Sequence, residues 1–268
     1  MTSKEIVLVT GANTGLGLAI VKALVQSGKA YTILLGGRDI NKAEAATQQL
    51  QAECPEKTSS IYPVQIDIEV DDSIQKLFDE ISSRYGRVDT LINNAGASFD
   101  SAFQSGQITT LRETWNKSWD VNVSGTNVLT HTLAPLLLQA PNPRLLFITS
   151  GTANLTDHDN QALAVNRSPE KGWPKSPAIS VPAYRSAKTG LNMLMREWYR
   201  TLKNDGVKTW AISPGLLATG LGGNGEEFMK KMGAGDPADG AALIREVVEG
   251  KYDEDTGKIV GRAGIQSW

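Results

Sequence analysis

Apolar runs of strand length alternate with helix-spaced segments along nearly the whole chain, and this alternation limits the folds it can adopt. The strand-like runs are continuously apolar, which is typical of strands buried on both faces. Short connections between such strands and amphipathic helices indicate a parallel, doubly wound sheet with helices on both faces. We therefore predict an α/β fold with a mainly parallel sheet of about seven strands across the 268 residues.

The ends of each apolar pattern define the predicted elements. Strands are predicted at residues 6–10, 31–35, 62–66, 88–92, 144–149, 207–213 and 258–260. Helices are predicted at 16–26, 41–52 with Asn41 as its cap, 71–85, 182–204 and 237–249, with one short and one long helix inside 108–140. Two irregular segments, 151–182 and 215–235, follow predicted strand ends, where ligands bind in such sheets.

The bulk composition excludes several classes of partner. The net charge of −2 does not favour nucleic acid or an anionic membrane surface, and no apolar stretch approaches the length of a membrane span. Cys54 is the only cysteine, and the first strand-like run starts too early for a secretory leader, so we expect a cytoplasmic protein. His131 and His158 form no metal-ligand pattern with Cys or carboxylates, so we expect no metal.

A glycine-rich turn joins the first predicted strand to the first helix, in the run Thr10-Gly-Ala-Asn-Thr-Gly-Leu-Gly17. Gly11 permits a tight turn, Gly15 lets the backbone approach a pyrophosphate, and Gly17 lets the helix pack closely on the sheet. The free N–H groups and the dipole of the new helix would hold phosphates. The turn therefore indicates a bound dinucleotide, although a plain strand–helix turn is the alternative.

Tyr184 and Lys188 lie four residues apart in a predicted helix, so they share one face. An ammonium group beside a phenol favours the phenolate, and we expect Lys188 to lower the pKa of Tyr184 towards working pH. A tyrosine tuned in this way can exchange a proton with a carbonyl or alcohol oxygen. Taken separately, the two residues could equally be a half-buried helix tyrosine and a solvated lysine.

The order and spacing of several motifs resemble the short-chain dehydrogenase/reductase family over nearly the whole chain. The motifs are Thr10-Gly-x-x-x-Gly-x-Gly17, Asn93-Asn94-Ala95-Gly96, Ser150, Tyr184-x-x-x-Lys188 and Pro214-Gly215. Within the family, Gly37-Arg38-Asp39 and Gly172-Trp173-Pro174 are most similar to carbonyl-reductase-type, NADPH-using members. This resemblance implies one Rossmann-type domain over residues 1–268 and a hydride-transferring enzyme.

The resemblance also implies roles for individual residues. Tyr184 would be the general acid, Lys188 would lower its pKa and bind the nicotinamide ribose, Ser150 would hydrogen-bond the substrate carbonyl, and Asn122 would anchor a water of the proton relay. The implied NADP(H)-binding residues are Gly11, Asn13, Thr14, Gly15, Leu16, Gly17, Arg38, Asp67, Ile68, Asn94, Ala95, Gly96, Tyr184, Lys188, Pro214, Gly215 and Thr219. Thr219 could equally be a surface loop residue.

The end of the second strand predicts the choice of cofactor. An acidic residue there would bind a ribose 2′-hydroxyl and repel a 2′-phosphate, whereas this chain has two glycines and then Arg38, whose guanidinium can bind a phosphate with two hydrogen bonds. NADP(H) is therefore favoured over NAD. Asp39 is the counter-argument, because it could point to the ribose instead. The alternative role of Arg38 is a surface ion pair. Thr14 stands where many NADP-using members of the family carry a second basic residue.

Ser150 and Tyr184 are separated by 34 positions, more than in most members of the family. The carbonyl-reductase branch resembles this chain in carrying an insertion here that blocks the usual subunit packing, so a monomer or a dimer is expected. Trp173 and Ile179 in the inserted segment could reach over the site. The insertion leaves Thr149 as an alternative to Ser150, although only one of two successive strand residues should face the ligand.

The segment 215–235 is predicted to be a lid over substrate and nicotinamide. Its glycines would let it close, and five apolar residues would contact a bulky, apolar ketone or aldehyde: Leu216, Leu217, Leu221, Phe228 and Met232. A loop with no substrate contact is the alternative. The predicted activity is NADPH-dependent reduction of a small-molecule carbonyl; NAD(P)-dependent alcohol oxidation and a nucleotide-bound binding protein with little turnover remain open.

Overall fold

In the computed structural model, which describes residues 4–55, 58–175 and 180–268, a single eight-stranded sheet runs through the described part of the chain. The strand order is β3-β2-β1-β4-β5-β6-β7-β8; neighbours from β3 to β7 pair in parallel, and β8 is antiparallel to β7. The strands are β1 (Glu5–Val9), β2 (Tyr31–Gly37), β3 (Ser60–Gln65), β4 (Thr90–Asn93), β5 (Arg144–Ile148), β6 (Lys208–Ser213), β7 (Ile259–Gly261) and β8 (Gly264–Gln266).

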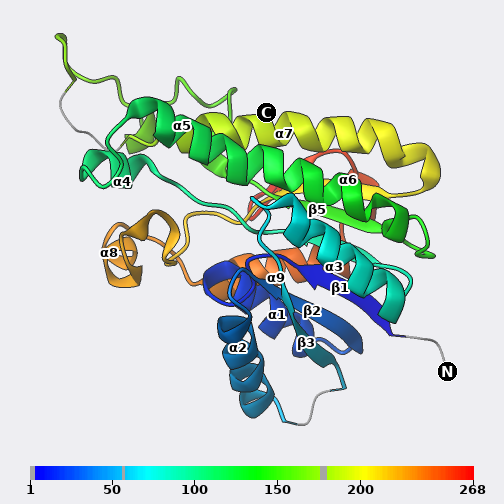
Figure 1. The fold of residues 1–268 in the computed structure, drawn as a ribbon. Coiled ribbons are helices and arrows are strands. Elements are labelled where there is room, and N and C mark those ends of the chain that lie inside the picture. The colour runs from blue at the N-terminus through cyan, green and yellow to red at the C-terminus, as the bar shows by residue number, and fades with distance from the viewer. Residues whose placement is uncertain (1–3, 56–57, 176–179) are drawn as a thin grey trace.

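Helices cover both faces of the sheet (Figure 1). Successive residues of a strand point to opposite faces, so Val7 and Val9 join the core beneath α1, α2 and α9, while Ile6 and Leu8 join the core beneath α3, α6 and α7. The helices are α1 (Gly15–Val25), α2 (Ile40–Glu53), α3 (Asp71–Arg84), α4 (Asp100–Gln104), α5 (Leu111–Trp119), α6 (Gly125–Leu137), α7 (Pro182–Leu202), α8 (Glu226–Lys231) and α9 (Pro237–Val248).

The predicted α/β, mainly parallel, doubly wound sheet is confirmed, with differences in detail. The eighth strand was not predicted, and the last predicted strand is shifted by one residue to Ile259–Gly261. The cap predicted for Asn41 is wrong: α2 begins at Ile40, and Asp39 caps it by accepting from the backbone N–H groups of Asn41 (3.0 Å) and Lys42 (3.4 Å). Asp39 is already extended there, which is the backbone conformation that a cap requires.

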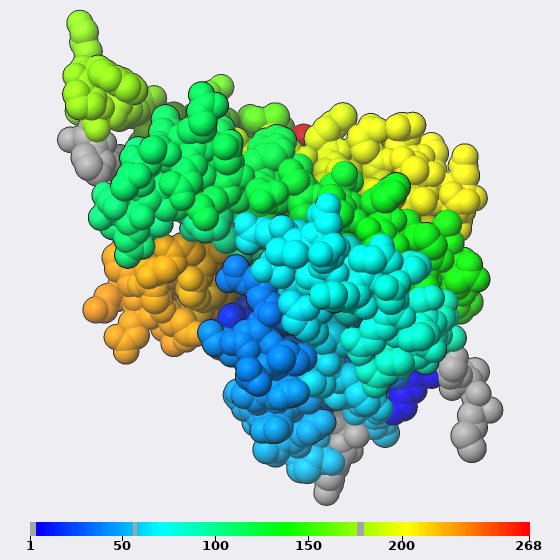
Figure 2. All heavy atoms as spheres, in the orientation of Figure 1, coloured from blue at the N-terminus to red at the C-terminus, as the bar shows by residue number. Residues whose placement is uncertain are grey.

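The strand order reverses between β1 and β4, because β2 and β3 lie on one side of β1 and β5 to β8 on the other side of β4. Such a reversal opens a crevice beyond the carboxyl ends of the strands, and this is where ligands bind in open α/β sheets. The short turn Leu221–Gly223, which precedes α8, contacts α4, and the segment around α8 protrudes beside it (Figure 2). Within the described residues no helix is long and apolar enough to cross a membrane.

Candidate active site

The glycine-rich turn has the backbone conformation that its glycines permit. Gly11 and Gly15 have φ values of 61° and 55°, in the left-handed region that favours glycine. A Cβ on Gly17 would lie 2.2 Å from the Gly11 carbonyl oxygen, so no larger residue fits there. Thr14 is the N-cap residue of α1, yet its side chain makes no capping hydrogen bond, and the first turn contains no acidic residue. The backbone N–H groups of the first turn of α1 therefore remain available to an anion.

The end of β4 is tied to this turn. Asn94 donates from Nδ2 to the carbonyl oxygens of Thr10 (2.8 Å) and Gly11 (3.2 Å). The Thr10 hydroxyl in turn accepts from the backbone N–H groups of Asn94 (3.1 Å) and Ala95 (3.0 Å). The structure therefore brings these predicted cofactor residues together, and the Asn94 side chain supports the turn.

Arg38 follows the end of β2, at the position where the sequence predicts contact with a 2′-phosphate. Its side chain is 73% exposed and forms a long ion pair with Glu69, 3.7 Å from Oε2. Burial, followed by the charge of Asp67, raises the pKa of Glu69. Asp39, the acidic residue that spoke against the choice of NADP(H), caps α2 with its side chain. Gly37 lies against Asn13, because a Cβ on Gly37 would be 3.1 Å from Asn13 Oδ1.

Further predicted cofactor residues follow the ends of β6 and β3. Thr219 packs against the turn, since a Cβ on Gly15 would lie 3.4 Å from Thr219 Cβ. The Thr219 hydroxyl accepts from the backbone N–H of Leu221 at 3.4 Å. Gly215 has a φ of 91°, and Pro214 packs close to Gly240 of α9 beside Leu16. Beyond β3, Asp67 accepts from the N–H of Glu69 at 3.1 Å, and Ile68 packs its carbonyl against Gly125.

Lys188 is buried beneath the predicted acid. Its ammonium nitrogen donates to the carbonyl oxygen of Ile148 at 2.8 Å and lies 5.8 Å from the centroid of the Tyr184 ring. Burial lowers the pKa of Lys188 to about 7. The helical spacing of four residues thus does place the two side chains together, as predicted.

The predicted direction of the Tyr184 shift is wrong for this structure. Burial raises the pKa of Tyr184 to about 12, and a hydrogen bond with Ser150 opposes that rise. Desolvation disfavours the charged phenolate, and the neighbouring Lys188 is itself desolvated, with a pKa of about 7. Tyr184 is therefore a protonated phenol over the whole neutral range, which suits a proton donor.

Asn122 lies on a π-helical turn, Asp120–Ser124, between α5 and α6. Its Nδ2 donates to the carbonyl oxygens of Ala97 and Ser118, both at 2.8 Å. Its Oδ1 is buried and accepts no hydrogen bond from any described residue. A Cβ on Gly96 would lie 2.7 Å from this oxygen and 3.1 Å from Lys188 Nζ, so the amide oxygen and the ammonium face the same small space. A buried orphan acceptor beside a cation is a suitable position for a bridging water.

Ser150, at the end of β5, faces Tyr184, and Thr149 does not. The hydroxyl of Thr149 is buried and donates to Asn192 Oδ1 at 2.6 Å, beneath α7. The alternation of strand side chains therefore decides between the two hydroxyls in favour of Ser150. The Ser150 hydroxyl also contacts Thr152, at 2.9 Å between the two oxygens.

The inserted segment is fastened to α7 rather than folded over the site. Arg185 donates to the carbonyl oxygens of Thr152 (2.7 Å) and Val165 (2.9 Å) and to Asn166 Oδ1 (2.7 Å). Trp173 is 88% exposed, so the prediction that it covers the site is wrong; the segment around it projects into solvent (Figure 1). Ile179, predicted for the same role, lies outside the described residues.

The segment predicted to be a lid contains the short helix α8 and contacts α4. Asn224 Nδ2 donates to the Ser101 hydroxyl at 3.4 Å. Leu217 is buried and packs against Gly240, so it does not belong to the predicted apolar surface of the lid. The other four predicted side chains are exposed: Leu216, Leu221, Phe228 and Met232.

Asp100, which the sequence reasoning missed, supports the start of α7. Its carboxylate is buried and accepts from the backbone N–H groups of Ala183 (3.0 Å) and Tyr184 (3.1 Å). Val181, the N-cap residue of α7, makes no side-chain capping bond. Asp100 therefore supplies the missing cap from a segment 83 residues earlier, and no local pattern in the sequence signals this pairing.

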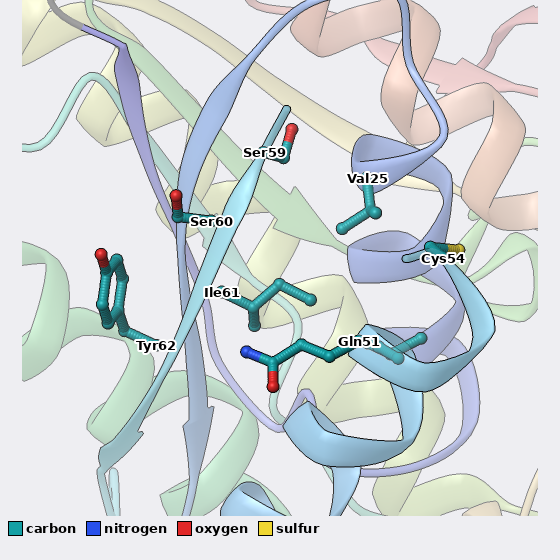
Figure 3. Close-up of a pocket in the computed structure, with 8 residues that line it drawn as sticks. Val25, Gln51, Cys54, Ser59, Ser60, Ile61 and Tyr62 are labelled. Atoms are coloured by element: carbon teal, nitrogen blue, oxygen red, sulfur yellow. The ribbon is translucent and has the colours of Figure 1, made fainter. Parts of the chain in front are cut away.

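A surface hollow of about 310 Å³ lies away from these residues (Figure 3). Figure 3 shows Gln51 of α2 facing Ile61 of β3, with Cys54 at the end of the helix. The hollow is at the start of β3, whereas the predicted site is at the carboxyl ends of the strands. It contributes no residue to the candidate active site.

Comparisons with known proteins identify the family. The sequence profile of the family described as short chain dehydrogenase matches residues 5–230. The short-chain dehydrogenase/reductase eupG of Phoma sp. is 45% identical, with 99% of this chain and 98% of the relative covered. The short-chain dehydrogenase/reductase tropE of Talaromyces stipitatus is 42% identical, with 98% and 97% covered.

Solved structures share the fold at low sequence identity. An NADPH-bound carbonyl reductase from chicken fatty liver superposes with a TM-score of 0.77, at 22% identity and 99% coverage of both chains. An L-sorbose reductase from Gluconobacter frateurii, complexed with NADPH and L-sorbose, superposes with a TM-score of 0.74, at 19% identity and with 97% of this chain and 95% of the other covered. The match over residues 5–230 and the two relatives above 40% identity show that this chain belongs to the short-chain dehydrogenase/reductase family of oxidoreductases.

Proposed function

We propose that this protein reduces a ketone or aldehyde to an alcohol with NADPH. The observation that supports this most is the partly buried Tyr184 side chain, which interacts with Ser150 at the end of β5 and lies next to Lys188. NADPH, when bound, supplies the hydride to the carbonyl carbon. The remaining chemistry is proton transfer and orientation, which the side chains perform.

Each residue has a role that its contacts support. Tyr184 donates its proton to the carbonyl oxygen, and Ser150 donates a hydrogen bond to the same oxygen. Lys188 binds the nicotinamide ribose and replaces the proton through a water held by the free Oδ1 of Asn122. The phenol stays protonated until a proton acceptor is in place, because burial raises the pKa of Tyr184 to about 12.

The cofactor residues fit a dinucleotide with a 2′-phosphate. The uncapped first turn of α1 would bind the pyrophosphate, with Thr219 beside it. Arg38 is mostly exposed and its ion pair with Glu69 is long, at 3.7 Å, so its guanidinium can turn to a phosphate. The NADPH-bound carbonyl reductase and L-sorbose reductase share this fold and motivate the same choice.

We propose an apolar substrate because the lid presents apolar side chains. Phe228 and Met232 are 51% and 45% exposed, and Leu221 lies on the segment that contacts α4. Such side chains would lose water on closing over a bulky apolar carbonyl compound.

We also propose a cytoplasmic location and a monomeric or dimeric state for this protein.

The test of the reaction is loss of NADPH absorbance with a panel of ketones and aldehydes. Tyr184→Phe is expected to lower kcat by about 100-fold or more, because it removes the proton donor and keeps the ring. Tyr199→Phe, on the same helix, is the matched control and should leave kcat unchanged. Equal rates for wild type and Tyr184→Phe would remove Tyr184 from the mechanism. Tight NADPH binding without turnover on any carbonyl would favour a binding protein.

The test of the cofactor is a comparison of NADPH and NADH in the Arg38→Ala variant. We expect the KM for NADPH to rise about 10- to 100-fold, since a charge-assisted bidentate contact is lost, with little change for NADH. Arg200→Ala, which alters an exposed arginine on α7, is the control. An unchanged preference in Arg38→Ala would overturn the assignment to NADP(H).

A further inference from the structure

Thr152 makes two contacts with the Ser150 hydroxyl that the reaction described above does not use. Its backbone N–H donates to Ser150 Oγ at 3.2 Å, and its own hydroxyl oxygen lies 2.9 Å from Ser150 Oγ. Both residues lie in the short turn that follows β5, where the inserted segment begins. A second hydroxyl is thus in hydrogen-bond contact with the one that would touch the substrate.

The number of protons and lone pairs limits how these hydroxyls can be arranged. A serine hydroxyl has one proton to donate and two lone pairs that accept. The N–H of Thr152 occupies one lone pair of Ser150. If Ser150 donated its proton to Thr152, it would have none left for a substrate oxygen. If Thr152 donates, both lone pairs of Ser150 are filled and its proton must point elsewhere.

The position of Thr152 is fixed from α7. Arg185 donates to the Thr152 carbonyl oxygen at 2.7 Å, and the Thr189 hydroxyl donates to the carbonyl oxygen of Ala153 at 3.1 Å. Arg185 and Thr189 are four residues apart and therefore share one face of the helix. The turn holding both hydroxyls is consequently attached to the helix that carries Tyr184.

We propose that Thr152 is a positioning residue, whose hydroxyl donates to Ser150 and so directs the Ser150 proton to the carbonyl oxygen of the substrate. This inference rests on the proposed reductase function. If Thr152 is the donor, the Ser150 proton is left free on the side of the Tyr184 hydroxyl, with which Ser150 interacts. The substrate oxygen would occupy the space between these two hydroxyls.

The test is the isosteric change Thr152→Val, which removes the hydroxyl and keeps the backbone N–H and the size of the side chain. We expect kcat/KM for the carbonyl substrate to fall about 3- to 10-fold, as for loss of one neutral hydrogen bond, with the Kd for NADPH unchanged. Thr152→Ser, which keeps the hydroxyl, should restore kcat/KM to within about two-fold. Thr156→Val removes a hydroxyl of the same segment that donates to the Trp268 carbonyl, and it should have no effect.

A double-mutant cycle separates positioning from general support of the fold. Under single-turnover conditions, which also measure slow variants, adding Thr152→Val to Ser150→Ala should cause no further loss, because Thr152 would act only through Ser150. An equal loss in both backgrounds, or an unchanged rate in Thr152→Val alone, would overturn the inference. Full activity in Ser150→Ala and Tyr184→Phe would instead refute the reductase site itself, so the two failures are distinguishable.

Discussion

Removing the Asp100 carboxylate should weaken both the protein and the step that Tyr184 performs. In Asp100→Ala the first turn of α7 loses two buried hydrogen bonds to a charged acceptor, at 3.0 and 3.1 Å. Each such bond contributes about 1.5–3 kcal/mol, so we expect the free energy of unfolding to fall by about 3–6 kcal/mol. Asp100→Asn keeps one acceptor oxygen and should lose about half as much.

The matched control is Asp236→Ala, which removes the exposed cap of α9, where Asp236 accepts from the N–H of Ala238 at 2.8 Å. An exposed cap contributes about 1 kcal/mol, and this one supports α9 and not the helix that carries Tyr184. Urea unfolding measures the stability, and kcat is measured where every variant is folded. We expect kcat to fall about 10- to 100-fold in Asp100→Ala only, because Tyr184 would be misplaced. A loss of stability with unchanged kcat would refute the link from Asp100 to Tyr184.

Two further predictions concern the space around Lys188. Gly96→Ala should lower kcat at least 10-fold, because its Cβ would lie 2.7 Å from Asn122 Oδ1 and 3.1 Å from Lys188 Nζ. The control is Gly28→Ala, which should leave kcat unchanged because no atom lies within 4 Å of the added Cβ. Equal rates in the two variants would argue against a tight site. In the wild type the free energy of unfolding should rise between about pH 7 and 10, and Lys188→Met should abolish this rise. Urea unfolding measured across this pH range tests it. Burial lowers the pKa of Lys188 from 10.5 to about 7, so the unfolded chain binds a proton that the folded protein has lost, and stability rises with pH until both forms are neutral. A parallel pH dependence in both proteins would show that Lys188 is not responsible.

Local patterns were sufficient to predict most of the fold. Continuous apolar runs predicted the parallel strands because both faces of this sheet are buried. The three-residue strand β8 has no such run, and its first residue, Gly264, has a φ of 114°, so its pairing with β7 depends on the turn rather than on an apolar pattern. The cap of α2 was misplaced by two residues, because Asp39 and Asn41 are both good capping residues and only the backbone decides between them.

Local patterns also predicted some features of the candidate site and missed others. Helical spacing predicted that Lys188 lies beside Tyr184, and strand alternation predicted that only one of Thr149 and Ser150 faces it. The direction of the Tyr184 shift depends on how far the phenol is desolvated, and spacing does not contain that information. Asp100 contacts α7 across 83 residues of sequence, so only the tertiary structure reveals it.

The helix α7 explains how a long insertion after Ser150 can coexist with an ordered site. Tyr184 and Lys188 form one pair at helical spacing that faces the crevice, and Arg185 and Thr189 form a second pair, one residue further, that holds the start of the insertion. Because both pairs belong to one rigid helix, the turn after Ser150 is positioned relative to Tyr184 whatever the later part of the insertion does. The exposed tip of that segment can therefore vary without moving the hydroxyls that would bind a carbonyl oxygen.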